Sequence, residues 1–464
     1  MSAFAAPPPR PRPKILILGG GIGGVSTAFD MSKEFHDAKI SADITVISPN
    51  EEFEFVPSNP GIFLRQIDPR DTHIDLQEIL EKKGIEYKQD KMTHVNPDIQ
   101  TIELKSGEIL PYDYLVLATG PKLSSAGVPG YRDHILSVCT SKHALEGAKK
   151  WEEYVKDPIS KGPVVVGALQ GASCFGPAVE MALMMETDLR QRQIRHKVPM
   201  YYLTPEPYVG HLGLKGVGVS RDLLESVLRE RSIEWRVNCE ILEVGEKEIR
   251  IRHRLKEDGD PIEETIPYGL SVMIPQFDGP GVASSNDQLF GPHGMVKINK
   301  KCQNDAYPNI FGVGVCVHIP PVDRDCPVPC GAPKTGYMIE TMGTAVASNV
   351  ASMIQGEKPS SIPSLGALCL TDFGDDGAVF MAVPQMAPRN INWFFRGVPA
   401  KLAKMAFEKY FMFKLRTGDT DPYYEKYMLH LIGLNRLDDF NSLPTSTKEA
   451  DQEEELRIRL KQKN

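Results

Sequence analysis

A glycine-rich turn near the start of the chain constrains the fold more than any other feature. An apolar run, KILIL, leads into Gly19, Gly21 and Gly24 in the pattern G-x-G-x-x-G, followed by a helix-compatible stretch at 25–35 and a second apolar run at 42–50. In such a strand–turn–helix unit, glycines permit a tight turn and let a pyrophosphate approach the positive end of the helix. The unit therefore predicts a dinucleotide-binding site.

The sequence does not identify which residue binds the ribose. The fingerprint expects an Asp or Glu about 20 residues further on, at the end of the second strand. Here that strand ends at Ser48, and Glu51 and Glu52 follow just after it. A short apolar run, YDYLVLATG, then ends in Thr119 and Gly120, and its periodicity predicts a buried strand. This strand and its small-residue turn resemble those that close over an FAD in flavoproteins with two dinucleotide domains.

A second strand–turn–helix pattern at 162–183 departs from the fingerprint. Leu169 stands where the second glycine would let the backbone approach a phosphate, and Cys174 lies inside the turn. This departure indicates that an NAD(P)H site is lost and that a thiol occupies the neighbouring space. A cysteine that is simply buried in a turn is the competing interpretation. If the thiol is reactive, a nearby base or cation should lower its pKa.

Composition excludes several classes of protein. The 464 residues suffice for about two or three domains. A net charge of −8 argues against nucleic acid, whose binding rests on basic residues. No apolar run reaches the ~18–20 residues needed to cross a bilayer, and eight cysteines are too sparse for a disulfide scaffold. Residues 1–13 form a Pro-rich segment without the apolar stretch of a secretory signal, which predicts a flexible leader.

The later segments predict a return to the first unit. A buried strand at 310–321 contains Gly314, and a long helix at 331–354 carries Lys334 and Thr335 in its first turn, where they can face a flavin. The stretch 390–418 then interleaves aromatic and basic side chains. A helix with aromatic residues on one side and basic residues on the other is typical of an interfacial membrane anchor, and a core helix with solvated lysines is the competing interpretation.

The predicted fold class is therefore α/β, with two Rossmann-like dinucleotide-binding domains and C-terminal amphipathic, membrane-associating helices. The first domain is expected to bind FAD. The expected division is a flexible leader at 1–13, an FAD-binding domain at 14–122 and 295–365, a second Rossmann-like domain at 123–294, a quinone- and membrane-associating region at 366–434 and a charged tail at 435–464.

Over residues 14–434 the chain resembles the sulfide:quinone oxidoreductases, which are flavoproteins with two dinucleotide domains related to flavocytochrome c sulfide dehydrogenase and type II NADH dehydrogenases. The most specific motif is GALQGASCFGPAVE, which surrounds Cys174. The other motifs that carry the resemblance are FEFVPSNP (53–60), SVCT (137–140), PYVGHLGL (207–214), PKTGYMIETM (333–342), CLTDFGD (369–375) and FEKYF (407–411).

The resemblance implies a set of redox-active thiols. It places a pair at Cys174 and Cys369 and a third, supporting cysteine at Cys139. It also matches His143 and His211 to histidines of the family motifs, and an imidazole can hold or shuttle a proton. Glu180 follows Cys174 on the predicted helix, where it can act as a base near the sulfur. For each of these three, a purely structural role is the competing interpretation.

The resemblance also implies how the cofactor and the quinone are held. Pro57 joins the flavin contacts already named, which are Gly19, Gly21, Gly24, Ser48, Thr119, Gly120, Gly314, Lys334 and Thr335. Lys404, Phe407 and Tyr424 match positions that line a quinone. An aromatic slot suits a flat apolar ring, and a cation stabilises the charge that develops as the ring is reduced.

The remaining cysteines have no assigned role. Cys326 and Cys330 stand four residues apart among prolines, but no further ligand lies at zinc-like spacing, so no metal site is predicted. They are interpreted as incidental or as a local disulfide. Cys316 is a rival for one of the three redox positions.

The resemblance implies an FAD enzyme that oxidises hydrogen sulfide to polysulfide or sulfur and reduces a ubiquinone- or menaquinone-type quinone. It further implies a homo-oligomer attached peripherally to the inner or cytoplasmic membrane. An NAD(P)H-dependent flavin quinone reductase, similar to type II NADH dehydrogenases, is the alternative, and a non-catalytic flavin-binding protein is the third hypothesis.

Overall fold

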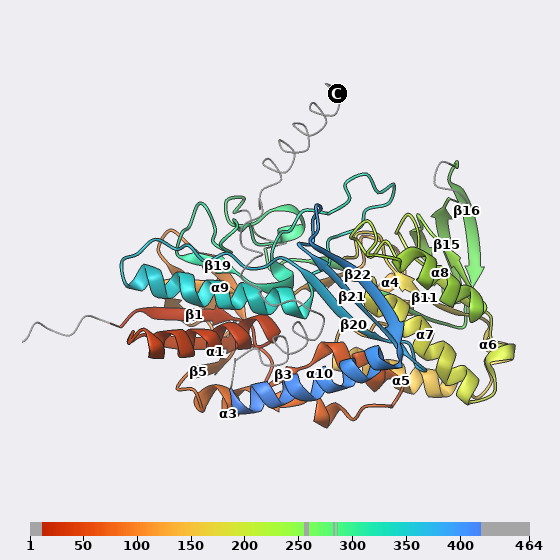
Figure 1. Ribbon diagram of the computed structural model, residues 1–464, viewed down its shortest axis with the longest axis horizontal. Coiled ribbons are helices and arrows are strands. Elements are labelled where there is room, and N and C mark those ends of the chain that lie inside the picture. The colour runs from red at the N-terminus through yellow and green to blue at the C-terminus, as the bar shows by residue number, and fades with distance from the viewer. Residues whose placement is uncertain (1–11, 255–258, 282–283, 285, 419–464) are drawn as a thin grey trace, which may run out of the picture.

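Two parallel sheets form the frame of the molecule, as the sequence predicts (Figure 1). The computed structural model describes residues 12–254, 259–281, 284 and 286–418. Within these residues the protein has the predicted α/β class, with two parallel-sheet units and a C-terminal amphipathic helix. The predicted leader up to residue 11, Tyr424 and the predicted tail lie outside the described residues.

The first parallel sheet has the strand order β19-β9-β1-β2-β5, and every neighbouring pair is parallel. Its strands are β1 (Lys14–Leu18), β2 (Asp43–Ser48), β5 (Glu86–Gln89), β9 (Tyr114–Leu117) and β19 (Ile310–Gly312). Strands that are buried on both faces have continuous apolar sequences, which explains the KILIL run. Helices α1 (Ile22–Asp37) and α9 (Gly336–Ile354) lie side by side against this sheet (Figure 1).

Strand β19 shows that the chain returns to the first sheet after a long excursion. Between β9 and β19 the chain builds the second parallel sheet, whose order is β13-β12-β11-β17. Its strands are β11 (Val164–Ala168), β12 (Met200–Leu203), β13 (Ile233–Arg236) and β17 (Leu270–Ile274). The helices of this unit are α4 (Tyr131–His134), α5 (Ser141–Tyr154), α6 (Pro158–Lys161), α7 (Gly176–Gln191) and α8 (Ser220–Glu230).

Each of the two parallel-sheet units also contains smaller antiparallel sheets. A three-stranded sheet contains β14 (Glu240–Val244), β15 (Glu248–His253) and β16 (Ile262–Pro267), and another contains β6 (Met92–Asn96), β7 (Thr101–Leu104) and β8 (Ile109–Pro111). Two-stranded pairs join β3 (Glu52–Glu54) to β4 (His73–Asp75) and β10 (Lys122–Ser124) to β18 (Gln276–Asp278). Short helices α2 (Asn59–Phe63) and α3 (Leu76–Glu81) complete the first unit.

The C-terminal part of the described chain is a three-stranded antiparallel sheet followed by one long helix. The strands are β20 (Ala367–Asp372), β21 (Gly377–Val383) and β22 (Ile391–Gly397), and the helix is α10 (Val398–Thr417). The sequence predicts a helix from residue 390, and this is wrong for β22. Phe394 is buried while Trp393 and Phe395 are exposed, and this period of two is that of a strand.

Two further expectations need correction. The predicted strand at 310–321 ends at Gly312, because the backbone of Gly314 has a φ of +85° and turns the chain into a single 3-10 turn, Gly314–Cys316. Lys334 and Thr335 do not lie in the first turn of the long helix. Thr335 is the N-cap of α9, and Lys334 precedes it.

Helix α10 exposes several apolar side chains and directs three of its lysines toward the protein. Its exposed apolar side chains are Val398, Leu402, Met405 and Phe413. Three of its lysines pair with acidic residues of the protein: Lys401 with Asp372, Lys404 with Glu180 and Lys414 with Glu340. The exposed Lys409 and Arg416 stand at helical spacing from Met405 and Phe413. The expected separation into an aromatic side and a basic side is therefore wrong for α10. No described helix is long and apolar enough to span a membrane.

The apolar core of the second unit extends beyond its own sequence. Ile62, Phe63 and Leu64, at the end of α2, pack into this core together with Ala367 and Phe380 from the C-terminal sheet. The two units and the C-terminal sheet therefore meet along a shared boundary, and the candidate site lies there.

Candidate active site

A cavity of about 980 Å³ runs from the glycine-rich turn to helix α10. It passes the carboxyl ends of β1, β2 and β9, then the turn that carries Cys174, and it reaches the inner side of α10. In open α/β sheets, ligands bind outside the carboxyl ends of the strands, and this cavity follows that rule. Its volume suits a dinucleotide-sized ligand.

The glycine turn fits a pyrophosphate group. A Cβ atom on Gly24 would lie 1.8 Å from the carbonyl oxygen of Gly19, so only glycine lets the helix approach the strand this closely. A Cβ atom on Gly21 would have no protein heavy atom within 4 Å, and Gly21 faces the cavity. Gly21 is also the N-cap of α1 and makes no side-chain cap, which leaves the first helical N–H groups for an anion.

The other predicted flavin contacts gather along the same cavity. Those that line it are Ser48, Pro57, Thr119, Gly120, Gly314, Lys334 and Thr335, together with Gly19 and Gly21. Gly24 lies behind the turn and does not line the cavity. At the end of β2, Glu52 lines the cavity and Glu51 does not, which makes Glu52 the nearer acidic candidate for a ribose.

Three cysteines that are far apart in the sequence meet at the cavity. Cys139 precedes α5, Cys174 lies in the loop between β11 and α7, and Cys369 lies on β20. A Cβ atom on Gly176, two residues after Cys174, would lie 3.4 Å from the Cys369 sulfur. The fold therefore brings the two predicted partners to one place, which their sequence separation could not establish. All three are free thiols in the structure.

The pKa values of these thiols differ from the expectation. Burial raises the pKa of Cys174 to about 11, and the positive charge of Lys334 offsets only part of this effect. Burial likewise raises the pKa of Cys139 to about 12 and that of Cys369 to about 12. The expected lowering is wrong because desolvation of a buried thiolate outweighs one nearby cation. The reduced thiols are neutral, so a thiolate formed here is a strong nucleophile.

Lys334 is the cation of this region. Its amino group donates a hydrogen bond to the carbonyl oxygen of Val315 at 3.2 Å. Burial lowers its pKa to about 8, against the opposing effect of the Cys316 and Cys174 thiolates. Lys334 therefore changes its charge within the working pH range of most enzymes.

A buried ion pair links the cysteine region to α10. Glu180 of α7 pairs with Lys404 of α10, and the backbone N–H of Asp372 donates to the same carboxylate oxygen at 3.1 Å. The Glu180 and Lys404 side chains are 4% and 15% exposed, respectively. Burial raises the pKa of Glu180, although Lys404 opposes the shift. Both residues line the cavity, so an ionisable pair lies between its two ends.

Aromatic rings line the α10 end of the cavity. Phe407 and Phe411 of α10 lie 5.9 Å apart between ring centroids, and Phe55 lies 5.0 Å from Phe411 and 6.4 Å from Phe407. All three line the cavity. The sequence reasoning missed Phe55 and Phe411 as site residues, although both stand in motifs that carry the resemblance. Tyr424, the remaining predicted quinone contact, lies outside the described residues.

Three candidates lie away from the cavity. Cys316 is fully buried behind β9, where its thiol donates to the carbonyl oxygen of Leu117 at 3.2 Å, so it is no rival for a place on the cavity wall. His143 lies in the first turn of α5 and does not line the cavity. His211 also lies outside it and contacts Asp323 and Cys326 instead.

The place of a second nucleotide is filled by protein. Leu169 is fully buried. The Gln170 amide exchanges hydrogen bonds with the backbone of Ile241, at 3.0 and 3.1 Å, and the Gly171 N–H donates to the carbonyl oxygen of Pro329 at 2.7 Å. These contacts close the turn that would otherwise hold a pyrophosphate.

The chain matches the family model described as pyridine nucleotide-disulphide oxidoreductase over residues 13–334. The sulfide-quinone reductase of Aquifex aeolicus (strain VF5) is 41% identical over 419 residues, which are 90% of this chain and 94% of that protein. The mitochondrial sulfide:quinone oxidoreductase of Dictyostelium discoideum is 25% identical over 317 residues, which are 66% of each protein.

Solved structures give the same relationship. The crystal structure of the sulfide:quinone oxidoreductase from Aquifex aeolicus superposes with a TM-score of 0.85 at 38% identity, over 94% of this chain and 99% of that chain. NDH2 from Plasmodium falciparum, solved with NADH, shares the fold with a TM-score of 0.64 at 17% identity, over 89% of this chain and 99% of that chain. The chain therefore belongs to the pyridine nucleotide-disulphide oxidoreductases and, within them, to the sulfide:quinone oxidoreductase family.

Proposed function

We infer that this protein is an FAD-dependent sulfide:quinone oxidoreductase, which oxidises sulfide and passes the electrons to a quinone. The observation that carries this conclusion is the composition of one cavity. It has a phosphate-binding turn, three thiols beyond that turn, and an aromatic wall with a buried lysine at α10. FAD, when bound, accepts two electrons and passes them on singly or together.

We propose that Cys174 and Cys369 form the sulfur-handling pair, with Cys139 as a supporting thiol. Hydrosulfide attacks a disulfide or sulfur-bridged pair, so that one S–S bond forms while another breaks and one cysteine leaves as a thiolate. The raised thiol pKa values make this thiolate reactive toward an electron acceptor. Lys334 stabilises the negative charge while it keeps its proton. The oxidised sulfur stays bound to cysteine. Each further hydrosulfide would lengthen it by one sulfur atom and give up two electrons, for which FAD, when bound, would be the acceptor, until the polysulfide is released.

Proton movement is proposed to use the Glu180–Lys404 pair. Reduction of a quinone to a quinol takes up two protons, and Lys404 lies at the cavity wall beside Phe407 to supply one. Glu180 holds the lysine charged and can return the proton. His143 and His211 remain predictions as proton carriers, and their distance from the cavity wall does not favour that role.

The quinone is proposed to enter along α10 and to lie against Phe407, with Phe55 and Phe411 completing the slot and Tyr424 as a further predicted contact. The outward apolar residues of α10, with Trp393 and Phe395 of β22, are proposed to rest on the membrane surface. Exposed apolar side chains along one face of a helix suit an interfacial position, from which a lipid-dissolved ring can reach the cavity. Attachment to the inner or cytoplasmic membrane, a ubiquinone- or menaquinone-type acceptor and a homo-oligomeric state are parts of this proposal.

The domain division at 14–122 with 295–365, at 123–294 and at 366–434 is likewise proposed. The two parallel sheets support it, whereas the packing of α2 into the second core means that neither unit is self-contained.

An anaerobic flavin titration tests this function. Purified, FAD-loaded protein is mixed with sulfide or with NADH, and the oxidised flavin absorbance is followed. We expect sulfide to bleach the flavin, NADH to leave it oxidised, and a short-chain ubiquinone analogue to restore it. Bleaching by NADH with none by sulfide would favour the NAD(P)H-dependent alternative. Flavin that responds to neither donor would favour a non-catalytic flavin protein.

A further inference from the structure

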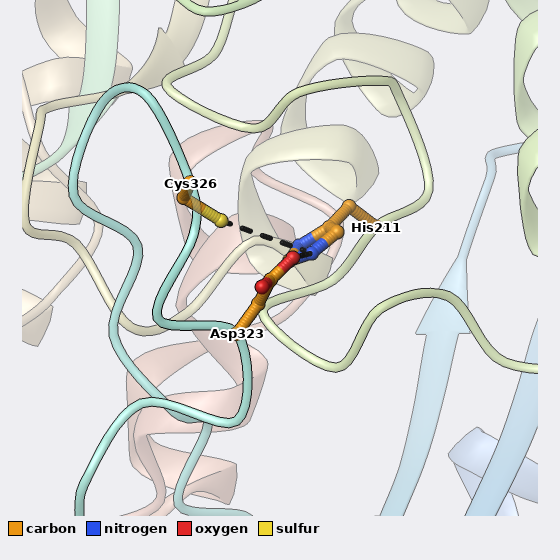
Figure 2. A group of neighbouring side chains, drawn as sticks. All are labelled: His211, Asp323 and Cys326. Atoms are coloured by element: carbon orange, nitrogen blue, oxygen red, sulfur yellow. Dashed lines mark hydrogen bonds and ion pairs between the residues drawn. The ribbon is translucent and has the colours of Figure 1, made fainter. Parts of the chain in front are cut away.

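A cluster of metal-ligating side chains lies outside the cavity. His211 comes from the segment between β12 and α8, whereas Asp323 and Cys326 come from the segment that leads to α9 (Figure 2). One nitrogen of His211, one oxygen of Asp323 and the sulfur of Cys326 all lie within 4.8 Å of one another. The sequence gives no sign of this meeting, because His211 stands 115 residues before Cys326.

The three side chains converge on one point. Nε2 of His211 lies 3.0 Å from Oδ2 of Asp323 and 3.9 Å from Sγ of Cys326. In a nucleophile–histidine–acid triad, the acid and the nucleophile contact opposite ring nitrogens. Here both face the same nitrogen, and Nδ1 has no hydrogen-bond partner among the described residues. The arrangement therefore surrounds a position and does not form a proton relay.

The distances suit a tetrahedral cation. Ligand atoms that lie 2.0–2.3 Å from zinc at tetrahedral angles are about 3.3–3.7 Å apart, and the two contacts to Nε2 bracket this range. The second oxygen of Asp323, Oδ1, is held by Lys215 at 3.1 Å. That ion pair fixes the carboxylate and leaves Oδ2 facing the histidine, in the way that an outer partner orients a metal ligand.

Cys330 supplies a fourth candidate ligand. It is buried four residues after Cys326, and its thiol donates to the carbonyl oxygen of Val328 at 3.6 Å. A turn of the Cys330 side chain away from this carbonyl group is needed to bring its sulfur to the group that the other three form. One imidazole, one carboxylate and two thiolates are donors that zinc accepts. Four protein ligands leave no open position, which is typical of a structural site and not of a catalytic one.

We propose that His211, Asp323, Cys326 and Cys330 bind one zinc ion that fastens the loop before α9 to the second parallel-sheet unit. This loop also holds the turn that carries Cys174. The Gly171 N–H donates to Pro329 at 2.7 Å, and the Gly331 N–H donates to Ala172 at 2.8 Å. The zinc ion thereby fixes the backbone next to the thiol site, from outside the cavity.

Metal analysis of the FAD-loaded, untagged protein tests this proposal. After dialysis against a weak chelator, we expect about one zinc per chain, and less than about a fifth of that in Cys326→Ser and Asp323→Asn. His196→Gln, which removes an exposed histidine elsewhere, should keep the full amount. In protein refilled with cobalt, we expect thiolate–cobalt absorption at wavelengths beyond the flavin bands.

Three results would overturn the proposal. The first is wild-type protein without zinc that also takes up no added zinc or cobalt. The second is zinc that both ligand variants retain in full, which indicates binding elsewhere. The third is a Cys326–Cys330 disulfide in the wild type as purified, detected by mass after alkylation without reductant. If Cys326→Ser fails to fold, the zinc contents of the Asp323→Asn variant and of the wild type still test the proposal.

Discussion

Replacing Lys404 with methionine should destabilise the protein, and replacing Glu180 as well should restore most of the loss. Lys404→Met leaves a carboxylate that is 4% exposed with one backbone N–H as its remaining hydrogen-bond donor. Breaking a buried ion pair costs about 3–5 kcal/mol. Lys404 is 15% exposed, so we expect the lower end, about 3 kcal/mol. The double variant Glu180→Gln/Lys404→Met buries no charge and should lie within about 1 kcal/mol of the wild type.

The pH dependence of the free energy of unfolding provides a second test of the Glu180–Lys404 pair. Burial raises the pKa of Glu180 above its ordinary value of 4.5, so the folded chain binds this proton when the unfolded chain has lost it. The contribution of Glu180 to the free energy of unfolding is therefore fully present below pH 4.5. It is lost as the pH rises through the pKa that Glu180 has in the folded chain. The deficit of Lys404→Met should be larger at pH 7.5 than at pH 5.

Urea denaturation with excess FAD, followed by tryptophan and flavin fluorescence, measures these differences. Coincidence of the two signals shows whether a single free energy of unfolding applies. The reasoning is refuted if the double variant loses as much stability as the sum of the two single variants, because the residues would then contribute independently.

Four further outcomes are expected. Gly21→Ala should lose flavin, because its Cβ meets no protein atom and enters the pyrophosphate position, but in the flavin-free state it should unfold at the wild-type midpoint. Gly24→Ala should lose flavin and also unfold at a lower flavin-free midpoint, because its Cβ meets Gly19. The ratio of flavin to protein absorbance and the melting curves of the flavin-free proteins separate the two cases. Burial lowers the pKa of Lys334 to about 8. The rate constant for flavin reduction, calculated from the hydrosulfide concentration, should therefore fall about tenfold per pH unit above 8. In Lys334→Met this rate constant should be low and independent of pH. The unfolded chain keeps the Lys334 proton up to pH 10.5, whereas the folded chain loses it near pH 8. The contribution of Lys334 to the free energy of unfolding should therefore rise between pH 8 and 10.5. Melting curves of Lys334→Met should lack this rise. Phe407→Ala should raise the quinone KM about tenfold through the loss of one stacked ring and should leave the rate of flavin reduction by sulfide unchanged; an equal effect on both would contradict the placement of the quinone.

Local patterns in the sequence predict the parts of this fold that local physics determines. The G-x-G-x-x-G turn, the buried strand before it and the amphipathic α10 all follow from residues within about 20 positions of one another. The strand at Ile391–Gly397 does not, because aromatic and basic residues also suit a helix, and pairing with β21 decides between the two structures.

Contacts between distant segments could not be predicted in this way. The resemblance named Cys174 and Cys369, but only the fold shows that they face one cavity. The inward direction of Lys404 depends on Glu180, which is 224 residues away. The effect of burial on the thiols also escapes sequence patterns, because desolvation depends on every neighbour and not on one nearby cation.

The central claim is that electrons enter the cavity at the cysteines and leave it at the α10 end. Anaerobic stopped-flow measurement of the two half-reactions tests it most directly, with Cys174→Ser and Phe407→Ala as the paired variants. The account predicts that Cys174→Ser slows flavin reduction by sulfide at least a hundredfold, yet leaves quinone reoxidation of dithionite-reduced flavin at the wild-type rate. Phe407→Ala should leave flavin reduction by sulfide at the wild-type rate and slow reoxidation by subsaturating quinone about tenfold. Wild-type reduction by sulfide in Cys174→Ser, or equal slowing of both half-reactions in either variant, would contradict it.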